Sequence, residues 1–147
     1  MEKLDWIERA AIENLTRRVQ NADAIHKEAN TLLALLLSGG GAALYFAAKE
    51  TALTSVALSV SFWLFAVAIA VTWNCLMFSD YPAVWNEPKN LNNTQYELDL
   101  LREYELENIQ ERIEQATRLN HAKSEWLNRC ILAACLTPVV AFTVWAV

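Results

Sequence analysis

The chain has 147 residues, of which 54% are hydrophobic and 20% charged, and it carries a formal net charge of −5 at neutral pH. Its apolar residues are concentrated in three long uncharged runs, which argues against a water-soluble core and predicts an all-α integral membrane protein. The acidic balance and the lack of a basic stripe lead us to expect no nucleic-acid partner.

Residues 1–30 form the first predicted element, a cytoplasmic amphipathic helix. Apolar side chains recur at three- and four-residue steps from Leu4 to Ala29, and the segment contains neither glycine nor proline. This spacing places the apolar side chains in one stripe. We expect the helix to continue directly into the first membrane span.

Three uncharged runs predict the membrane spans. Residues 31–48, 51–79 and 130–147 are 18, 29 and 18 residues long without a charged side chain, and about 20 apolar residues carry a helix across a bilayer. We therefore expect three transmembrane helices in contact with membrane lipid, the first two joined by a short turn at residues 49–51.

The first span contains every glycine of the chain, within a run of six small residues at 38–43. Small residues let helix backbones approach each other closely in lipid. Three interpretations stay open: packing within one protomer, contact between subunits, and a hinge. We expect a homo-oligomer whose assembly or opening weakens on Gly40→Leu. The residues predicted for helix packing or oligomerisation are Ser38, Gly39, Gly40, Gly41, Ser55 and Ser59.

Residues 80–93 form a predicted extended connector, and residues 94–129 a second cytoplasmic helix. Thr94 and Glu97 have the spacing of a capping box at the start of that helix. Further along, an apolar seam with heptad spacing includes Leu106, Ile109 and Ile113.

Both cytoplasmic helices run toward the membrane, so we expect them to pair in parallel as a stalk. The connector must then lie extended along the stalk, or the second span must protrude, or the second cytoplasmic helix must be broken. The third span, 130–147, contains Pro138. Proline removes a backbone hydrogen bond, so we expect a kink there, at about the depth of the glycines.

Lysine and arginine predict the orientation of the spans. Residues 1–30 and 80–129 contain eleven of these side chains, whereas the opposite side has only Lys49. Cytoplasmic segments carry the excess of basic residues. We expect a multi-pass protein of the bacterial inner membrane with a cytoplasmic N-terminus and a C-terminus on the external or periplasmic side.

The sequence contains no motif that predicts chemistry. Cys75, Cys130 and Cys135 do not have metal-ligand spacing, and no nucleophile, phosphate-binding or metalloprotease motif is present. We expect no enzyme activity, catalytic residue, metal or cofactor. His26 and His121, each on a helix next to the membrane, are interpreted as solvated or interface histidines. The carboxylates of the second cytoplasmic helix are interpreted as a solvated face or a docking surface for a soluble partner.

The order of elements resembles a known family. An amphipathic helix before the membrane, a hairpin of two spans closed by Lys49-Glu50-Thr51 and a following cytoplasmic helix are similar to the small bacterial membrane effectors of the SLATT type. The resemblance covers residues 1–115, lies in the organisation, and implies a protein of antiviral nucleotide-signalling systems that disrupts the membrane.

Three functions follow as hypotheses. The first is an oligomeric membrane effector or pore, for which several subunits are needed because three spans cannot enclose a pore. The second is a membrane anchor that uses its acidic cytoplasmic helices to hold a soluble protein. The third is a holin-like lysis protein, which the long acidic stalk disfavours.

Overall fold

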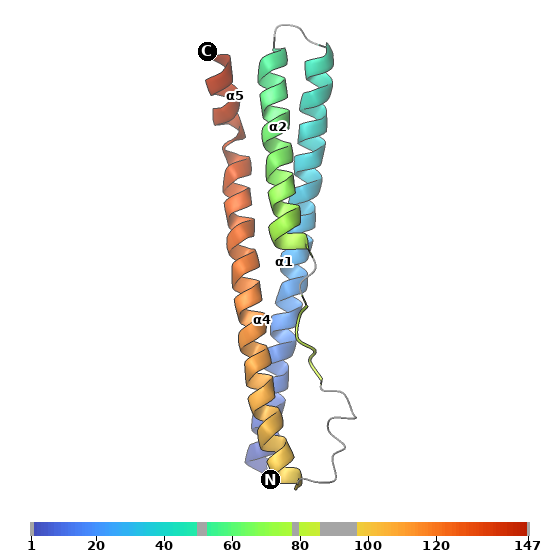
Figure 1. The fold of residues 1–147 in the computed structure, drawn as a ribbon, viewed down its shortest axis with the longest axis vertical. Coiled ribbons are helices and arrows are strands. Elements are labelled where there is room, and N and C mark those ends of the chain that lie inside the picture. Colours follow the sequence, from blue (N-terminus) through green and yellow to red (C-terminus); the bar gives the residue numbers. More distant parts are fainter. Residues whose placement is uncertain (1, 50–52, 78–79, 86–96, 147) are drawn as a thin grey trace. The chain divides into compact units, whose positions relative to one another are not determined.

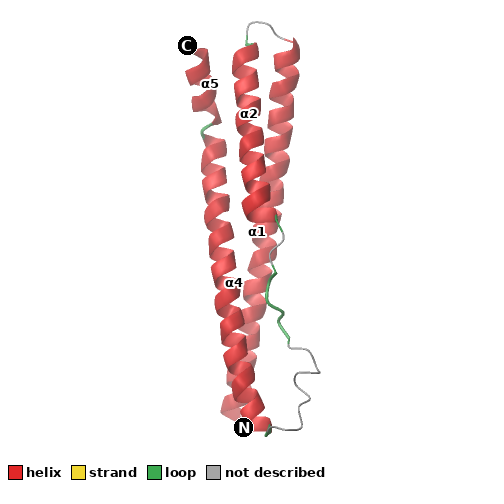
Figure 2. Cartoon of the chain, in the orientation of Figure 1, coloured by secondary structure: helices red, strands yellow, loops and turns green. Residues whose placement is uncertain are grey.

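The computed structural model describes residues 2–49, 53–77, 80–85 and 97–146, with side chains from residue 4 onward. The regular elements of the described residues are all helices, and these residues contain no strand (Figures 1 and 2). Its elements are α1 (Glu2–Lys49), α2 (Thr54–Val71), the π-helix η1 (Thr72–Leu76), α4 (Leu98–Cys135) and α5 (Thr137–Trp145).

Three helices of this set are long and apolar enough to cross a membrane. They are α1, α2 with η1, and α4 with α5. Because α1 is one helix of 48 residues, the predicted segments 1–30 and 31–48 lie in one uninterrupted element. The all-helical fold suggests a multi-pass membrane protein, as the apolar runs predict.

The chain divides into two compact units, and α1 and α4 contribute to both. The first unit comprises residues 1–24 with 79–122, and the second comprises residues 25–78 with 123–147.

The first unit contains a parallel pair of helices. Leu15 of α1 packs with three residues of the predicted seam region of α4 in a small apolar cluster. In order along the chain, Asp5 and Glu8 contact Arg102, and Arg18 contacts Asn120, so the two helices run in the same direction. The buried members of the cluster are Leu15, Ile109, Ile113 and Ala116.

In the second unit α2 lies between α1 and the α4–α5 pair and runs antiparallel to both (Figure 1). It packs against α5. The C-terminal half of α2 forms the centre of an apolar core with α1 and α4. The buried residues of this core are Ala29, Leu36, Val67, Ala68, Val71, Cys75, Leu127 and Cys130.

The end of the second span differs from the prediction. The α-helical part stops at Val71 and is followed by the π-helix, in which the Met77 N–H donates to the Thr72 carbonyl at 2.9 Å. Met77 itself has extended backbone angles, so the helix ends before residue 79. A π-turn commonly accommodates one additional residue within an α-helix.

Several predicted features lie partly or wholly outside the described residues. These are the turn at 49–51 beyond its first residue, the connector beyond Trp85, and the capping box, of which only Glu97 is described. Residues 80–85 are not helical. The Tyr81 hydroxyl donates to Asn120 Oδ1 at 3.0 Å, which attaches this part of the connector to α4 within the first unit.

Candidate functional site

The central helix of the second unit, α2, donates side-chain hydrogen bonds to both of its neighbours. Ser61 Oγ donates to the Gly40 carbonyl of α1 at 2.9 Å, and Trp63 Nε1 donates to the Ala133 carbonyl of α4 at 3.1 Å. Ser61 is 2% exposed. Hydrogen bonds between membrane helices are worth about 0.6 kcal/mol on average. Since the donors are two residues apart on α2, Gly40 and Ala133 lie at similar levels on opposite sides of it.

The glycines are required by close approach and not by backbone conformation, because all of them have negative φ. A Cβ atom on Gly40 would lie 3.3 Å from two carbons of the Phe65 ring, and one on Gly39 would lie 3.2 Å from Leu64 Cδ1. A Cβ atom on Gly41 would meet nothing within 4 Å. Gly39 and Gly40 therefore pack against α2 of the same chain, whereas Gly41 is on the open side of α1.

The predicted serines contribute less than expected to this contact. Ser38 is exposed and donates to the Ala34 carbonyl of its own helix at 2.7 Å. Ser55 is exposed and Ser59 is half-buried. The serine that contacts α1 is Ser61, which the sequence interpretation missed.

A signal for Ser61 was present in the sequence. Ser61, Ala68 and Cys75 follow one another at seven-residue steps, and all three are buried. Small side chains repeated with this spacing lie on one face of a helix. The pair Ser55 and Ser59 has a four-residue spacing that is equally helical, but it lies on a different face of α2.

The third span is interrupted close to Pro138. Here α4 ends at Cys135, Leu136 forms a turn, and α5 begins at Thr137. Proline has no N–H group, so the carbonyl of Ala134 loses its usual helical donor. The Thr137 hydroxyl donates to that carbonyl at 2.6 Å, and this bond compensates for the loss.

The neighbouring carbonyl at this break has two donors. Ala133 accepts from the Leu136 N–H at 3.1 Å and from the Trp63 indole. In lipid, an unpaired carbonyl costs free energy because water is absent. The interruption is therefore held by α2 on one side and by Thr137 on the other, opposite the glycines of α1.

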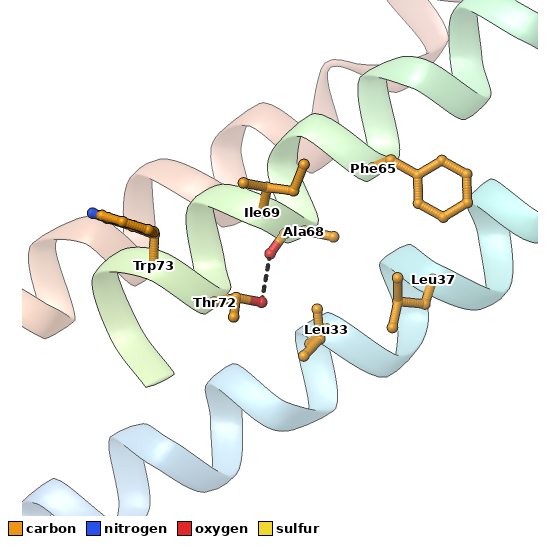
Figure 3. Close-up of a pocket in the computed structure, with 7 residues that line it drawn as sticks. All are labelled: Leu33, Leu37, Phe65, Ala68, Ile69, Thr72 and Trp73. Carbon is orange, nitrogen blue, oxygen red and sulfur yellow. Dashed lines mark hydrogen bonds between the residues drawn. The ribbon is translucent and has the colours of Figure 1, made fainter. Parts of the chain in front are cut away.

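A shallow apolar groove lies beside this contact, between α1 and α2 (Figure 3). Its walls are Leu33 and Leu37 of α1 and a row of residues along α2. Ile69 and Trp73 are each 68% exposed, so the groove opens outward. The residues of α2 in its wall are Phe65, Ala68, Ile69, Thr72 and Trp73.

Two basic residues meet in the second unit, outside the three apolar spans. Lys123 is 5% exposed, and its Nζ atom lies 2.8 Å from Nε2 of His26. Burial lowers the pKa of Lys123. The Cys75 thiol of η1 donates to the Lys123 carbonyl at 3.7 Å. The sequence interpretation took His26 as a solvated or interface histidine, and heptad spacing alone does not reveal its contact with Lys123.

The first unit holds an ion cluster that the sequence interpretation also missed. The Arg102 guanidinium is paired with Asp5 and with Glu8, the latter at 2.7 Å. The hydrogen bond from Arg102 lowers the pKa of the Asp5 carboxyl. This cluster joins α1 to the start of α4. Of the predicted seam residues, Ile109 and Ile113 are buried and Leu106 is half-buried.

Among the described residues, no group of three or more histidine, cysteine or acidic side chains is arranged to hold a metal ion. Comparison of the chain with known families, curated proteins and solved structures finds no match.

Proposed function

We propose that the protein is a small bacterial inner-membrane effector that self-associates through α1 and perturbs the membrane as an oligomer. The proposed topology has three spans, a cytoplasmic N-terminus and an external C-terminus. Lysine and arginine are distributed eleven to one between the two sides, and this bias supports the orientation. The organisation similar to SLATT-type effectors supports a role in antiviral defence.

The observation that carries the proposal is an exposed face of small residues on α1. Gly41 lies on this face, and a side chain there would meet no atom of its own chain within 4 Å. Apolar side chains gain nothing by leaving lipid for one another, whereas small residues allow the close backbone contact that drives association. The exposed small residues of the face are Ala34, Ser38, Gly41, Ala42 and Ala48.

The three glycines therefore differ in what they contact. Gly39 and Gly40 are occupied by α2 of the same chain, as described above, so they support the protomer. Gly41 is available to a second copy. Several copies are required because three helices cannot enclose a water-filled path, and the proposed oligomer would use α1 as its contact.

The mass of the full-length protein in mild detergent tests this proposal. We expect an oligomer for the wild type and a smaller species for Gly41→Leu. Ala66→Leu is the matched control, because Ala66 is an exposed small residue on α2 outside the proposed contact. Dye leakage and membrane potential of expressing cells should change with the same variant. A monomeric wild type, or an unchanged mass for Gly41→Leu, would contradict the assembly.

A second candidate function, a membrane anchor for a soluble protein, is supported by a groove in the first unit. Leu4 and Leu98 line it together with Arg102 and three carboxylates. Leu98 is 71% exposed. Arg102 is already neutralised by Asp5 and Glu8, and no ion pair of the described residues involves the rim carboxylates. Those carboxylates are Glu97, Asp99 and Glu103.

The partner proposed for this groove is a basic segment that also carries apolar side chains, because the groove combines negative charge with leucine side chains. Nanodiscs of uncharged lipid containing the full chain can be titrated with a labelled lysine–leucine peptide. Neutralising Glu97, Asp99 and Glu103 should weaken binding about tenfold, since exposed ion pairs contribute up to about 1 kcal/mol each. Neutralising Glu107, Glu111 and Glu114 removes the same charge as a control, and an equal loss would refute a specific groove.

A further inference from the structure

A polar side chain interrupts the apolar seam between α1 and α4 in the first unit. Asn120 lies one helical turn after the buried Ala116, and it is half-buried itself. Its Nδ2 atom donates to the Arg18 carbonyl of α1 at 2.7 Å, and its Oδ1 atom accepts from the Tyr81 hydroxyl at 3.0 Å. One amide group thus joins α1, α4 and the segment that follows the second span.

The two partners fix the orientation of this amide. A carbonyl oxygen can only accept a hydrogen bond, whereas an asparagine side chain has a donor at one end and an acceptor at the other. Nδ2 must therefore face Arg18, and Oδ1 then faces Tyr81, whose hydroxyl can bond to it only as a donor. Burial, and after it the carboxylate of Asp23, raises the pKa of Tyr81, so the hydroxyl keeps the proton that it donates.

Loss of the Tyr81 donor would weaken the bond between Asn120 and Arg18, in which Tyr81 takes no direct part. A half-buried acceptor without a donor costs free energy, and the Asn120 side chain recovers this cost by turning Oδ1 toward water. That rotation moves Nδ2 away from the Arg18 carbonyl, because both atoms belong to one planar amide. The polar contact between α1 and α4 thus depends on the segment at 80–85.

We propose that residues 80–85 act as a strap in which Tyr81 is a positioning residue, because it holds the Asn120 amide against α1. Withdrawal of the strap would release this polar contact between α1 and α4, whereas the apolar cluster around Leu15 would remain. The strap begins three residues after Met77, so a movement of the second span is the change that we expect to withdraw it. The inference does not depend on the proposed oligomer, because all the groups belong to one chain.

Hydrogen exchange of the Asn120 side-chain amide, followed by NMR on the full chain in nanodiscs, tests the strap. The Nδ2 protons face α1, so their exchange rate reports the bond to Arg18. We expect Tyr81→Phe to raise this rate about fivefold, as the loss of one net hydrogen bond predicts. Tyr104→Phe is the matched control, since it removes the hydroxyl of an exposed tyrosine of α4, and it should leave the rate unchanged. An equal rate in the wild type and in Tyr81→Phe would overturn the proposal.

The backbone amide of Ile113 distinguishes positioning from a general loss of stability. Ile113 belongs to the apolar cluster, so the exchange of its N–H group reports opening of the whole contact between the helices. We expect Tyr81→Phe to accelerate exchange at Asn120 Nδ2 more than at Ile113. Acceleration by the same factor at both groups would refute a positioning role for Tyr81.

Thermal unfolding supplies a second, independent measurement. Tyr81→Phe should lower the unfolding midpoint of the otherwise wild-type chain by about 3 °C. In an Asn120→Leu background there is no amide to position, so the same change should lower the midpoint much less. Asn120→Ala takes the place of the leucine variant if that variant does not fold. Equal shifts with and without the Asn120 amide would contradict the strap.

Discussion

Leucine substitutions at Gly40 and Gly41 make the same chemical change one residue apart, and we expect them to affect the protomer in opposite directions. At Gly40 the first added carbon would lie 3.3 Å from the Phe65 ring, and the remaining atoms would displace it. Such overpacking costs about 1–3 kcal/mol, and loss of the Ser61 hydrogen bond adds about 0.6 kcal/mol. The better helix propensity of leucine returns about 0.8 kcal/mol.

At Gly41 only the gain in helix propensity applies, because a Cβ atom there meets no other atom within 4 Å. The two variants should therefore differ by about 2–4 kcal/mol in the free energy of unfolding. Unfolding of monomeric protein in detergent, followed by circular dichroism, measures this difference. If Gly40→Leu proved as stable as Gly41→Leu, the close packing of α1 against α2 described here would be wrong.

Three further predictions address other contacts. Trp63→Phe keeps an aromatic ring but removes the N–H group that donates to the Ala133 carbonyl. It should lower the free energy of unfolding by about 0.6–1.7 kcal/mol, and an unchanged unfolding curve would contradict this contact. Ile109→Ala, at a position that is 2% exposed, should cost about 2–5 kcal/mol, whereas Leu100→Ala, at an exposed position of the same helix, should cost much less. Arg102 lowers the pKa of Asp5, so their pairing should stabilise the fold at neutral pH, and this stabilisation should be lost as the pH falls below the usual range of aspartate. Arg102→Met should remove this acid dependence, which is measured as the free energy of unfolding at a series of pH values.

The helical class was accessible from the sequence because its signals are local. Long uncharged runs and three- to four-residue spacing predict the three long helices that the structure contains. The burial of Ile109 and Ile113 also agrees with heptad spacing, which is a property of one helix alone. Such features require no knowledge of which helices become neighbours.

The polar contacts could not be predicted in this way, because they depend on the register between helices that are distant in sequence. Ser61 and Gly40 are 21 residues apart, and Lys123 and His26 are 97 apart. A shift of one residue along either helix would turn these side chains away from each other. Gly40 and Gly41 look alike in the sequence, and only the position of α2 distinguishes them.

The π-helix at the end of the second span has a consequence for insertions and deletions. Each residue turns an α-helix by about 100°, and the wide turn at Thr72–Leu76 accommodates a surplus residue without shifting the buried positions before it. Deletion of one residue there would restore α-helical geometry while changing the direction in which the chain departs after Met77. The residue count of this turn, more than its hydrophobicity, thus sets the point at which the polypeptide leaves the helix.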